Sequence, residues 1–219
     1  MTKKTYQRRK IKKRSASISR KTTETKISCK LVIDGDGKHD IKTGIGFLDH
    51  MLTLFAFHGL FDLKLKVKGD LEVDIHHTNE DAAICLGQAF KKALGACRGI
   101  KRFASSEVPM DHARAKATVD VGNRFSYSGI KFKDAEAQPN LSSITSNKPG
   151  ENYSMEDGND FLETFAKNLA INLHVDIIAR SDMHHMLEAV FKAFAIALDR
   201  ATQIDPRRTK AVPSTKGIL

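Results

Sequence analysis

The spacing of apolar residues in the first half of the chain changes between the period of a strand and that of a helix. Apolar positions alternate with polar ones over residues 24–33, and a glycine-rich turn follows at 35–37, a pattern that predicts a β-hairpin. Apolar residues then recur at helical spacing over 48–55, alternate as a strand over 63–67, and return to helical spacing over 82–94. The predicted order of elements is ββαβα.

The same order recurs in the second half. Apolar patterning predicts strands over residues 117–121 and 125–132, a helix from Phe161, a strand over 171–177 and a helix over 184–201. The chain is therefore expected to contain two like halves.

A shift of 108 residues superimposes the two halves. It places the first HHxxE element, His76-His77-Thr78-Asn79-Glu80, on the second, His184-His185-Met186-Leu187-Glu188. It also matches apolar positions beyond them, because Leu86 falls on Phe194. Agreement of motif and core positions at one shift indicates an internal duplication. We expect an α+β fold of two ββαβα halves with sheets packed on helices, similar to the ribosomal protein S5 domain 2-like fold.

The expected organisation has three parts. Residues 1–14 form a basic disordered tail, residues 15–110 the first half, and residues 111–219 the second half with a C-terminal phosphate-binding tail. The stretch 133–159 is rich in Asn, Ser, Pro and Gly and lacks periodicity, which is typical of a surface loop.

The net charge of +10 comes from the start of the chain. Residues 1–21 hold ten of the 36 Lys and Arg and no acid, so the remainder has 26 basic residues against 26 acidic ones. A run of like charge without apolar periodicity is typical of a solvated arm. Nucleic-acid binding and organellar import are alternatives, but the tail lacks a clear amphipathic pattern and the body is formally neutral.

The location is expected to be cytoplasmic. No apolar run has the length of a membrane span or of a secretory signal. Cys29, Cys85 and Cys97 are odd in number, lack CxxC spacing and lie in apolar surroundings. This pattern predicts buried free thiols in a reducing compartment.

The HHxxE elements predict a metal site. On a helix, His76 and Glu80 share one face, while His77 points elsewhere; His184, Glu188 and His185 repeat this division. If the halves are related by approximate two-fold symmetry, each ion can take a His/Glu pair from one element and the spare His from the other. Two ions follow, and this ligand set suits Mn, Fe, Co, Ni or Zn, of which Mn is preferred because its higher coordination number leaves room for substrate.

Two residues earlier in each half extend this set. His50 precedes His76 by 26 residues, and Asp160 precedes His184 by 24, so both open the first helix of their half. If His50 is a ligand, Asp160 is its symmetric partner. His174 is an alternative ligand, but its polar strand position favours a structural role.

The C-terminus predicts an anion site. Ser214, Thr215, Lys216 and Gly217 place two hydroxyls, an ammonium group and a glycine backbone in a short segment. Arg102 and Arg124 are candidates for a bidentate phosphate contact. Further candidates near the metal face are Lys192, one helical turn after Glu188, and His58, near a helix end.

These residues make the chain similar to the imidazoleglycerol-phosphate dehydratase family. The resemblance runs from about Arg14 to Leu219 and lacks a phosphatase half, as in monofunctional members. The stretches that carry it are Arg20–Ile27, Thr43–Leu52, His76–Glu80, Lys101–Phe103, Val108–Asp111, His184–Ala193 and Pro213–Leu219.

The resemblance implies dehydration of imidazole glycerol phosphate to imidazole acetol phosphate in histidine biosynthesis. It implies two Mn²⁺ per active site and a homo-oligomer of 24 subunits with active sites between subunits. The implied metal ligands are His50, His76, His77, Glu80, His184, His185 and Glu188. The implied substrate contacts are Glu24, His50, His58, His76, Glu80, Arg102, Arg124, His184, Lys192, Ser214, Thr215 and Lys216. The sequence departs from the family at Asp160, where a ligating His is common.

The chemical difficulty of this reaction is a non-acidic C–H beside the imidazole ring. Two ions on the ring nitrogens would stabilise an imidazolate, whose electrons can expel hydroxide. Glu24, Glu80 and Glu188 are the candidate catalytic carboxylates, with proton transfer assigned to Glu24 and Glu188. A two-metal phosphoesterase and a nucleic-acid-binding protein are the alternative functions.

Overall fold

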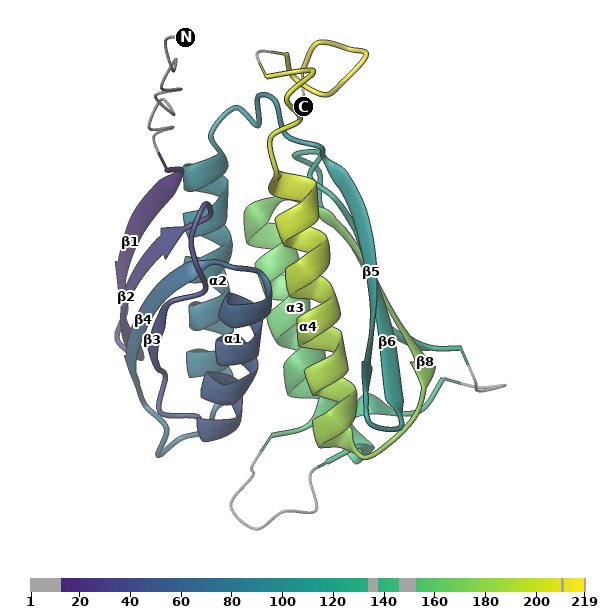
Figure 1. Ribbon diagram of the computed structural model, residues 1–219. Helices are drawn as coiled ribbons and strands as arrows, with labels where there is room; N and C mark the ends of the chain where they lie inside the picture. The colour runs from purple at the N-terminus through teal and green to yellow at the C-terminus, as the bar shows by residue number, and fades with distance from the viewer. Residues whose placement is uncertain (1–12, 134–137, 146–152, 210, 219) are drawn as a thin grey trace, which may run out of the picture.

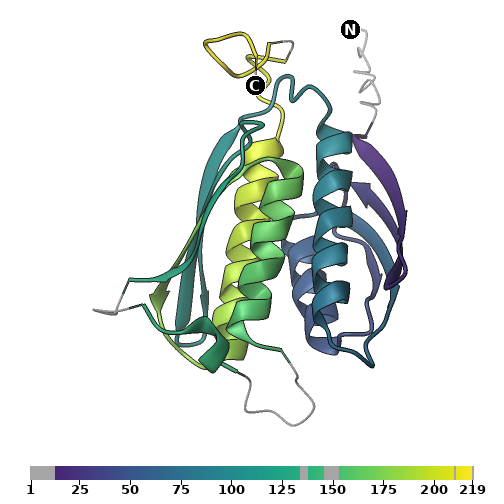
Figure 2. The same cartoon turned by 180° about the vertical axis from the view of Figure 1, so that it is seen from behind.

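The computed structural model describes residues 13–133, 138–145, 153–209 and 211–218. In these residues, two four-stranded sheets form the outer layers and four long helices lie between them (Figure 1, and from behind in Figure 2). The predicted disordered tail lies outside the described residues except for Lys13 and Arg14. The α+β fold with two like halves is confirmed.

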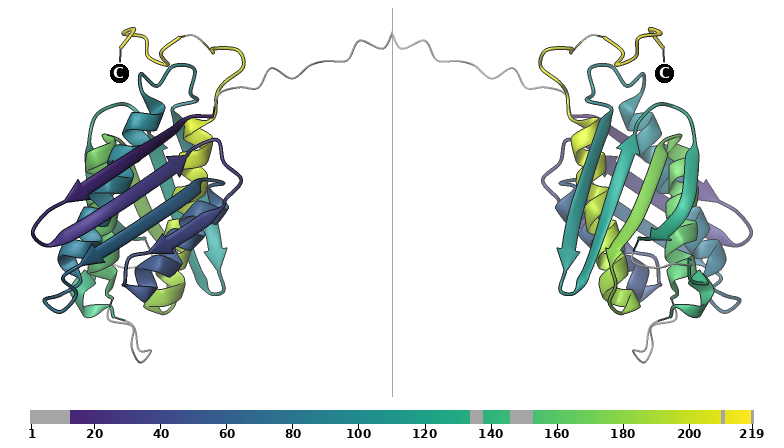
Figure 3. Two further views of the ribbon diagram at one scale, coloured as in Figure 1. Left: turned by 90° about the vertical axis from the view of Figure 1, so that its left-hand side faces the viewer. Right: turned by 90° about the vertical axis from the view of Figure 1, so that its right-hand side faces the viewer.

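The first half contains four strands and two helices, one strand more than predicted. Its elements are β1 (Ser15–Lys21), β2 (Thr25–Val32), β3 (His39–Lys42), α1 (Gly46–His58), β4 (Asp62–Gly69) and α2 (His76–Leu94). The sheet order is β1-β2-β4-β3, and β3 runs parallel to β4 (Figure 3, left).

The hairpin predicted across residues 35–37 is wrong. The observed hairpin joins β1 and β2. The strand that follows residue 37, β3, pairs with β4 instead of with β2. The Asp62 carboxylate anchors this crossing, because the backbone N–H groups of Asp36 and Lys38 donate to its Oδ1 at 2.8 and 3.1 Å. Alternation identifies a strand, but the neighbour in the sheet is decided by such distant contacts.

The second half repeats the arrangement. Its elements are β5 (Phe103–Met110), β6 (Ala113–Asp120), β7 (Ser126–Phe132), α3 (Met155–Leu169), β8 (Asn172–Ala179) and α4 (Met183–Thr202), with a short 3₁₀ helix at Leu141–Ser143. The sheet order is β5-β6-β8-β7 (Figure 3, right). The boundary predicted at residues 110 and 111 falls inside the β5–β6 hairpin, so the second half begins earlier, before Phe103.

Helix α3 begins at Met155, within the stretch 133–159 that was expected to be a loop. Ser154 caps the helix, because its hydroxyl accepts from the Asp157 N–H and the Asp157 carboxylate accepts from the Ser154 N–H. This Ser-x-x-Asp cap starts the helix several residues before the apolar residues recur at helical spacing. The sequence pattern therefore placed the start of the helix too late, at Phe161.

The halves join through their helices. Helix α1 packs on α4, and α2 packs on α3. One phenylalanine from each helix, Phe55, Phe90, Phe165 and Phe194, meets at the centre with ring centroids 5.3 to 5.9 Å apart. Gly87 permits the close approach of α2 and α3, because a Cβ there would lie 2.7 Å from the Phe165 carbonyl oxygen. Each half therefore buries its helices against the other.

The cysteines are unpaired, with Cys29 and Cys85 buried and Cys97 half-buried. Burial raises the pKa of Cys29 to about 12 and of Cys85 to about 11. Among the described residues, no helix combines the length and apolarity that crossing a bilayer requires.

Candidate active site

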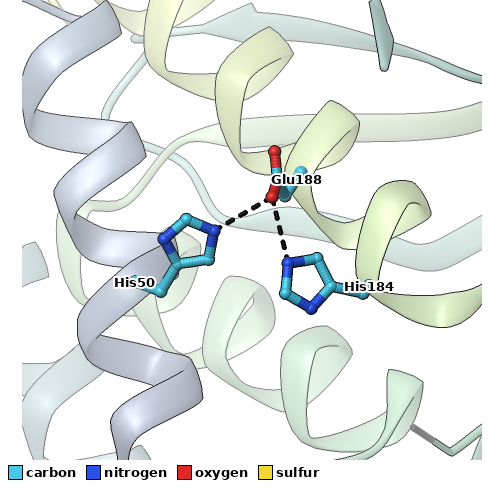
Figure 4. Close-up of side chains that lie close together, drawn as sticks. All are labelled: His50, His184 and Glu188. Atoms are coloured by element: carbon cyan, nitrogen blue, oxygen red, sulfur yellow. Dashed lines mark hydrogen bonds and ion pairs between the residues drawn. The ribbon is translucent and has the colours of Figure 1, made fainter. Parts of the chain in front are cut away.

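Three predicted ligands converge where α1 crosses α4. His50 Nε2 lies 2.9 Å from Glu188 Oε1, and His184 Nε2 lies 3.0 Å from the same oxygen (Figure 4). His184 and Glu188 are one turn apart on α4, whereas His50 comes from α1 of the other half. Packing of the two halves therefore builds this cluster, which we call the α1–α4 cluster.

A lysine balances the negative charge of Glu188 in the α1–α4 cluster. Lys192 Nζ donates to Glu188 Oε2 at 2.6 Å, and only 8% of the Glu188 side chain is exposed. Burial raises the pKa of Glu188, but hydrogen bonds from Lys192 and His50 outweigh it and lower that pKa to about 2. Burial and the nearby Lys192 also lower the pKa of His58. Glu188 is thus held as an anion.

The α1–α4 cluster fits a metal ion. Among the described residues, its three donor atoms form the one group of at least three His, Cys, Asp or Glu ligands that lie within 4.8 Å of one another. Two imidazole nitrogens and an ionised carboxylate are ligands for a divalent transition metal. The donor set is therefore compatible with the predicted ion.

The corresponding pair of ligand-type side chains in the first half is more open. His76 Nε2 and Glu80 Oε2 are 4.0 Å apart, and both side chains are more than half exposed. Asp160 lies half-buried on α3, where its charge acts on Tyr127 and Tyr153, and it joins no ligand group among the described residues. The ligand role of Asp160 stays a prediction.

The two spare histidines have matching surroundings. Nδ1 of His77 is hydrogen-bonded to Asp70 Oδ2 at 3.0 Å, and Nδ1 of His185 is hydrogen-bonded to Asp182 Oδ2. The bond with Asp70 raises the pKa of His77. Asp182 also caps α4, because its Oδ1 accepts from the His185 backbone N–H at 3.2 Å. A carboxylate on one ring nitrogen orients the other nitrogen for metal binding.

The other ring nitrogen of each spare histidine, Nε2, faces a carboxylate on a hairpin turn. His77 Nε2 lies 3.9 Å from Glu24 Oε1 in the β1–β2 turn, and His185 Nε2 lies 3.4 Å from Asp111 Oδ2 in the β5–β6 turn. The duplication therefore extends from the histidines to these turns.

Buried aromatic residues lie between the two HHxxE elements within one chain. The Phe47 ring contacts His184 at 5.2 Å and Tyr153 at 5.0 Å, and Tyr153 Oη donates to Asn79 Oδ1. The spare histidines face the hairpin turns instead of the opposite element. As far as the described residues extend, a single chain therefore does not bring the spare histidine of one element to the other, and the exchange of histidines between elements stays a prediction.

The predicted anion-binding residues converge on a second site. A cavity of about 340 Å³, which we call the C-terminal cavity, is lined by Arg102, Gly122, Arg124, Ser214, Thr215, Lys216 and Ile218. These residues come from the chain between α2 and β5, the β6–β7 connection and the C-terminal segment. Three positive charges and two hydroxyls are suited to a phosphate group.

The two sites lie at opposite ends of α4. The Arg102 N–H donates to the carbonyl of Ala201 near the end of that helix, whereas Glu188 is in its second turn. At about 1.5 Å per residue, the helix rises about 20 Å between Glu188 and Ala201.

A larger cavity, of about 660 Å³, is shallow and lies on the outer face of the first sheet, lined by Lys30, Asp40, Lys64 and neighbouring residues. It contains none of the predicted ligands, so the chemistry described above lies elsewhere.

Sequence reasoning missed Asp70, Asp111, Asp182 and Asp120 around these sites. Asp182 carried a signal, because an Asp before an apolar helix is a typical N-cap. The other three lie at strand ends or in a turn, and nothing local distinguishes them from solvated carboxylates.

Comparisons with known proteins show which family the chain resembles. The family model described as imidazoleglycerol-phosphate dehydratase matches residues 43–198. A protein of that name from Thermoanaerobacter pseudethanolicus is 50% identical over 207 residues, which cover 94% of this chain and all of the relative. One from Bacillus pumilus is 49% identical with the same coverage.

Two solved structures are similar to the whole fold. The imidazoleglycerol-phosphate dehydratase of Staphylococcus aureus has a TM-score of 0.71 at 28% identity, covering 87% of this chain and 99% of that one. The enzyme of Pyrococcus furiosus, solved in complex with (S)-C348, has a TM-score of 0.72 at 30% identity, covering 92% and 100%.

Proposed function

The chain belongs to the imidazoleglycerol-phosphate dehydratase family, whose members are lyases of histidine biosynthesis, and we propose that it dehydrates imidazole glycerol phosphate with two Mn²⁺ ions per active site. The observation that carries the metal-dependent form of the proposal is the convergence of His50, His184 and Glu188 from two different halves. Two imidazole nitrogens and a nearly buried, ionised carboxylate that meet at one point form a donor set suited to a divalent transition metal, which supports the proposal.

The two HHxxE elements supply the proposed ligands of both ions. His50, His184 and Glu188 would hold one, and His76, Glu80 and Asp160 the other, with His77 and His185 as the remaining donors. Ions bound by these residues would supply Lewis acidity toward the imidazole of the substrate, which would make the neighbouring C–H easier to ionise.

The chain's own residues perform the remaining tasks. Glu24 precedes Thr25, whose hydroxyl donates to the buried Asp81 and fixes the turn. From this turn, Glu24 moves a proton at the substrate carbon. Lys192 keeps Glu188 ionised, which suits Glu188 as a metal ligand and, in the proposed proton transfer, as the accepting carboxylate. The guanidinium groups of Arg102 and Arg124 bind the phosphate with Ser214, Thr215 and Lys216.

Distance supports active sites that lie between subunits. The C-terminal cavity and the α1–α4 cluster are separated by about 20 Å along α4, and a substrate made of one imidazole ring, a three-carbon chain and one phosphate is shorter than that. The two sites of one chain cannot serve the same molecule. We propose that the ions of one subunit and the cavity of a neighbour act together, in a homo-oligomer of 24 subunits.

In the same assembly, the spare histidines would act as metal ligands. His77 and His185 are oriented by carboxylates but face the hairpin turns of their own chain. A neighbouring subunit could therefore take these donors for its own ions. We also propose a cytoplasmic location, in keeping with three unpaired cysteines, and no nucleic-acid partner.

The test is a dehydratase assay with controlled metal content. Chelation should abolish turnover, and Mn²⁺ should restore it more fully than Zn²⁺. Glu24→Gln should lower kcat by roughly a hundredfold, in the range of general acid-base catalysis, while the metal content stays at the wild-type level. Glu107→Gln, on the exposed face of β5, is the matched control and should leave kcat unchanged.

Unchanged turnover in the Glu24 variant would remove Glu24 from the mechanism. Full activity after complete metal removal would contradict the metal-dependent mechanism. Release of inorganic phosphate in place of imidazole acetol phosphate would favour a phosphoesterase.

A further inference from the structure

Asp120 is linked to the C-terminal cavity through Arg102. The Arg102 guanidinium donates from Nε to Asp120 Oδ1 at 2.7 Å and from Nη2 to Oδ2 at 3.1 Å. Its Nη1 donates to the Pro213 carbonyl oxygen at 2.9 Å. Pro213 directly precedes Ser214, Thr215 and Lys216, so one carboxylate fixes both an arginine of the cavity and the segment that carries its other anion-binding groups.

The backbone of Arg102 is equally constrained. Its φ angle is +77°, in the left-handed region that L-residues rarely adopt. The Arg102 N–H donates to the Ala201 carbonyl at 2.8 Å, and its own carbonyl accepts from the Val121 N–H at 3.0 Å. Such a conformation persists only where surrounding contacts enforce it, and it is common at binding sites.

Gly122 leaves room for the Asp120 carboxylate. A Cβ at residue 122 would lie 3.0 Å from both carboxylate oxygens, closer than an ordinary van der Waals contact. Gly122 also lines the C-terminal cavity. The position of the carboxylate therefore depends on the absence of a side chain here.

The first half contains a similar clamp, whose residues Arg14 and Asp34 line neither of the two cavities described above. Arg14 donates from Nε and Nη2 to the two oxygens of Asp34 at 2.9 and 2.6 Å, and from Nη1 to the Thr202 carbonyl at 2.6 Å. Arg14 precedes β1 as Arg102 precedes β5, and Asp34 follows β2 as Asp120 ends β6. The third bond of this clamp goes to the end of α4, so it connects the two halves.

We propose that Asp120 is a positioning residue for the substrate phosphate. It orients the Arg102 guanidinium and, through Nη1, holds the Pro213 carbonyl so that the tail residues face the same cavity. Three of the five guanidinium N–H groups are used by Asp120 and Pro213, which leaves two for phosphate. The inference rests on the proposed function, because it assigns the phosphate of that substrate to this cavity.

The experiment compares Asp120→Asn with Asp34→Asn in the metal-loaded, assembled enzyme. Loss of one charge-assisted contact should raise KM for imidazole glycerol phosphate and the inhibition constant of inorganic phosphate on the order of tenfold. The turnover number should change less than about threefold, because the phosphate does not react. Asp34→Asn should lower the melting temperature and leave KM unchanged.

Two further variants separate positioning from folding. Gly122→Ala keeps every clamp group but presses on the carboxylate, and it should also raise KM if Asp120→Asn proves insoluble. In a double-mutant cycle, Asp120→Asn should add little to Arg102→Ala, because the first acts through the second.

Unchanged KM and phosphate inhibition in both Asp120→Asn and Gly122→Ala would overturn the inference while the dehydratase function stands. An equal rise of KM in Asp34→Asn would also overturn it, because both clamps would then act through stability. If the wild type lacks dehydratase activity, calorimetric titration with inorganic phosphate still decides the role of Asp120. Equal affinity of wild type and Asp120→Asn would reject it.

Discussion

The two halves of the chain carry the same elements, yet within the part of the chain that the structure describes only the HHxxE element of the second half belongs to a closed group of metal-type donors. In that half, His184 and Glu188 receive His50 from the neighbouring helix α1. In the first half, His76 and Glu80 are 4.0 Å apart and exposed, and the helix α3 that packs beside them offers Asp160, which is shorter than histidine. Duplication has preserved the scaffold of both halves, whereas the proposed ligand sets differ in exposure and in the residue, His50 or Asp160, that the neighbouring helix offers.

This comparison predicts that the two proposed ions differ in affinity. Glu188→Gln removes a ligand from the closed cluster, and Glu80→Gln removes one from the open pair. Loss of a direct ligand should exceed the ten- to hundredfold cost that is usual for outer partners, so we expect the affected ion to bind more than about a hundredfold more weakly. Titration of the metal-free variants with Mn²⁺ should assign the tighter ion to Glu188. If both variants lose the same ion, the halves do not hold separate ions.

Asp160→His should reduce the difference between the halves. A longer imidazole on α3 can reach toward His76 and Glu80 as His50 reaches toward its own pair, and the weaker ion should bind on the order of tenfold more tightly. Glu163→His, one turn further along α3, is the control and should leave both affinities unchanged. Unchanged Mn²⁺ titration in Asp160→His would show that water or another group completes the first-half site.

The clamp of the first half should contribute to stability in a pH-dependent manner. Burial raises the pKa of Asp34, but hydrogen bonds from Arg14 outweigh it and lower that pKa below the ordinary carboxyl value. The unfolded chain therefore takes up the proton first as the pH falls, so the stabilisation is present at neutral pH and is lost between the ordinary carboxyl pKa and the lowered one.

Thermal unfolding from pH 7 to pH 3 measures this contribution. Asp34→Asn should lower the melting temperature by roughly 2–4 °C at pH 7, as expected for about 1 kcal/mol in a chain of this size, and the difference from wild type should shrink in acid. Asp36→Asn, at a neighbouring exposed carboxylate, should have no such effect. A difference that stays constant with pH would mean that the ion pair is not responsible.

The smallest expected effect concerns the outer faces of the sheets. Lys30 and Lys64 are direct neighbours across β2 and β4, whereas Lys116 lies between Glu107 and Asp176 on the second sheet. Lys30→Glu should stabilise the fold by about 0.5 kcal/mol, and Lys116→Glu should destabilise it by a similar amount. Denaturant titrations at low and high salt should show both effects decreasing with salt. Opposite signs would contradict the assigned strand register.

Much of the fold followed from local patterns. The spacing of Leu48, Met51, Leu52 and Phe55 predicted α1, and all four side chains are buried. Alternation around Leu63 and Leu65 predicted β4. The pairing of β3 with β4 and the start of α3 at Met155 were not predicted, because the first depends on a distant Asp62 and the second on a cap outside the apolar pattern.

The sequence alone determined the periodicity of the elements, their duplication and the residue types of the proposed ligands, because helices and strands repeat over a few residues and the HHxxE spacing fixes which side chains share a helical face. Only the tertiary structure decided which ligands meet. His50 and Glu188 are 138 residues apart in the chain and touch because α1 packs on α4. The separation of the C-terminal cavity from the α1–α4 cluster was likewise decided by helix length and packing, since no local pattern records the distance between two ends of a folded helix.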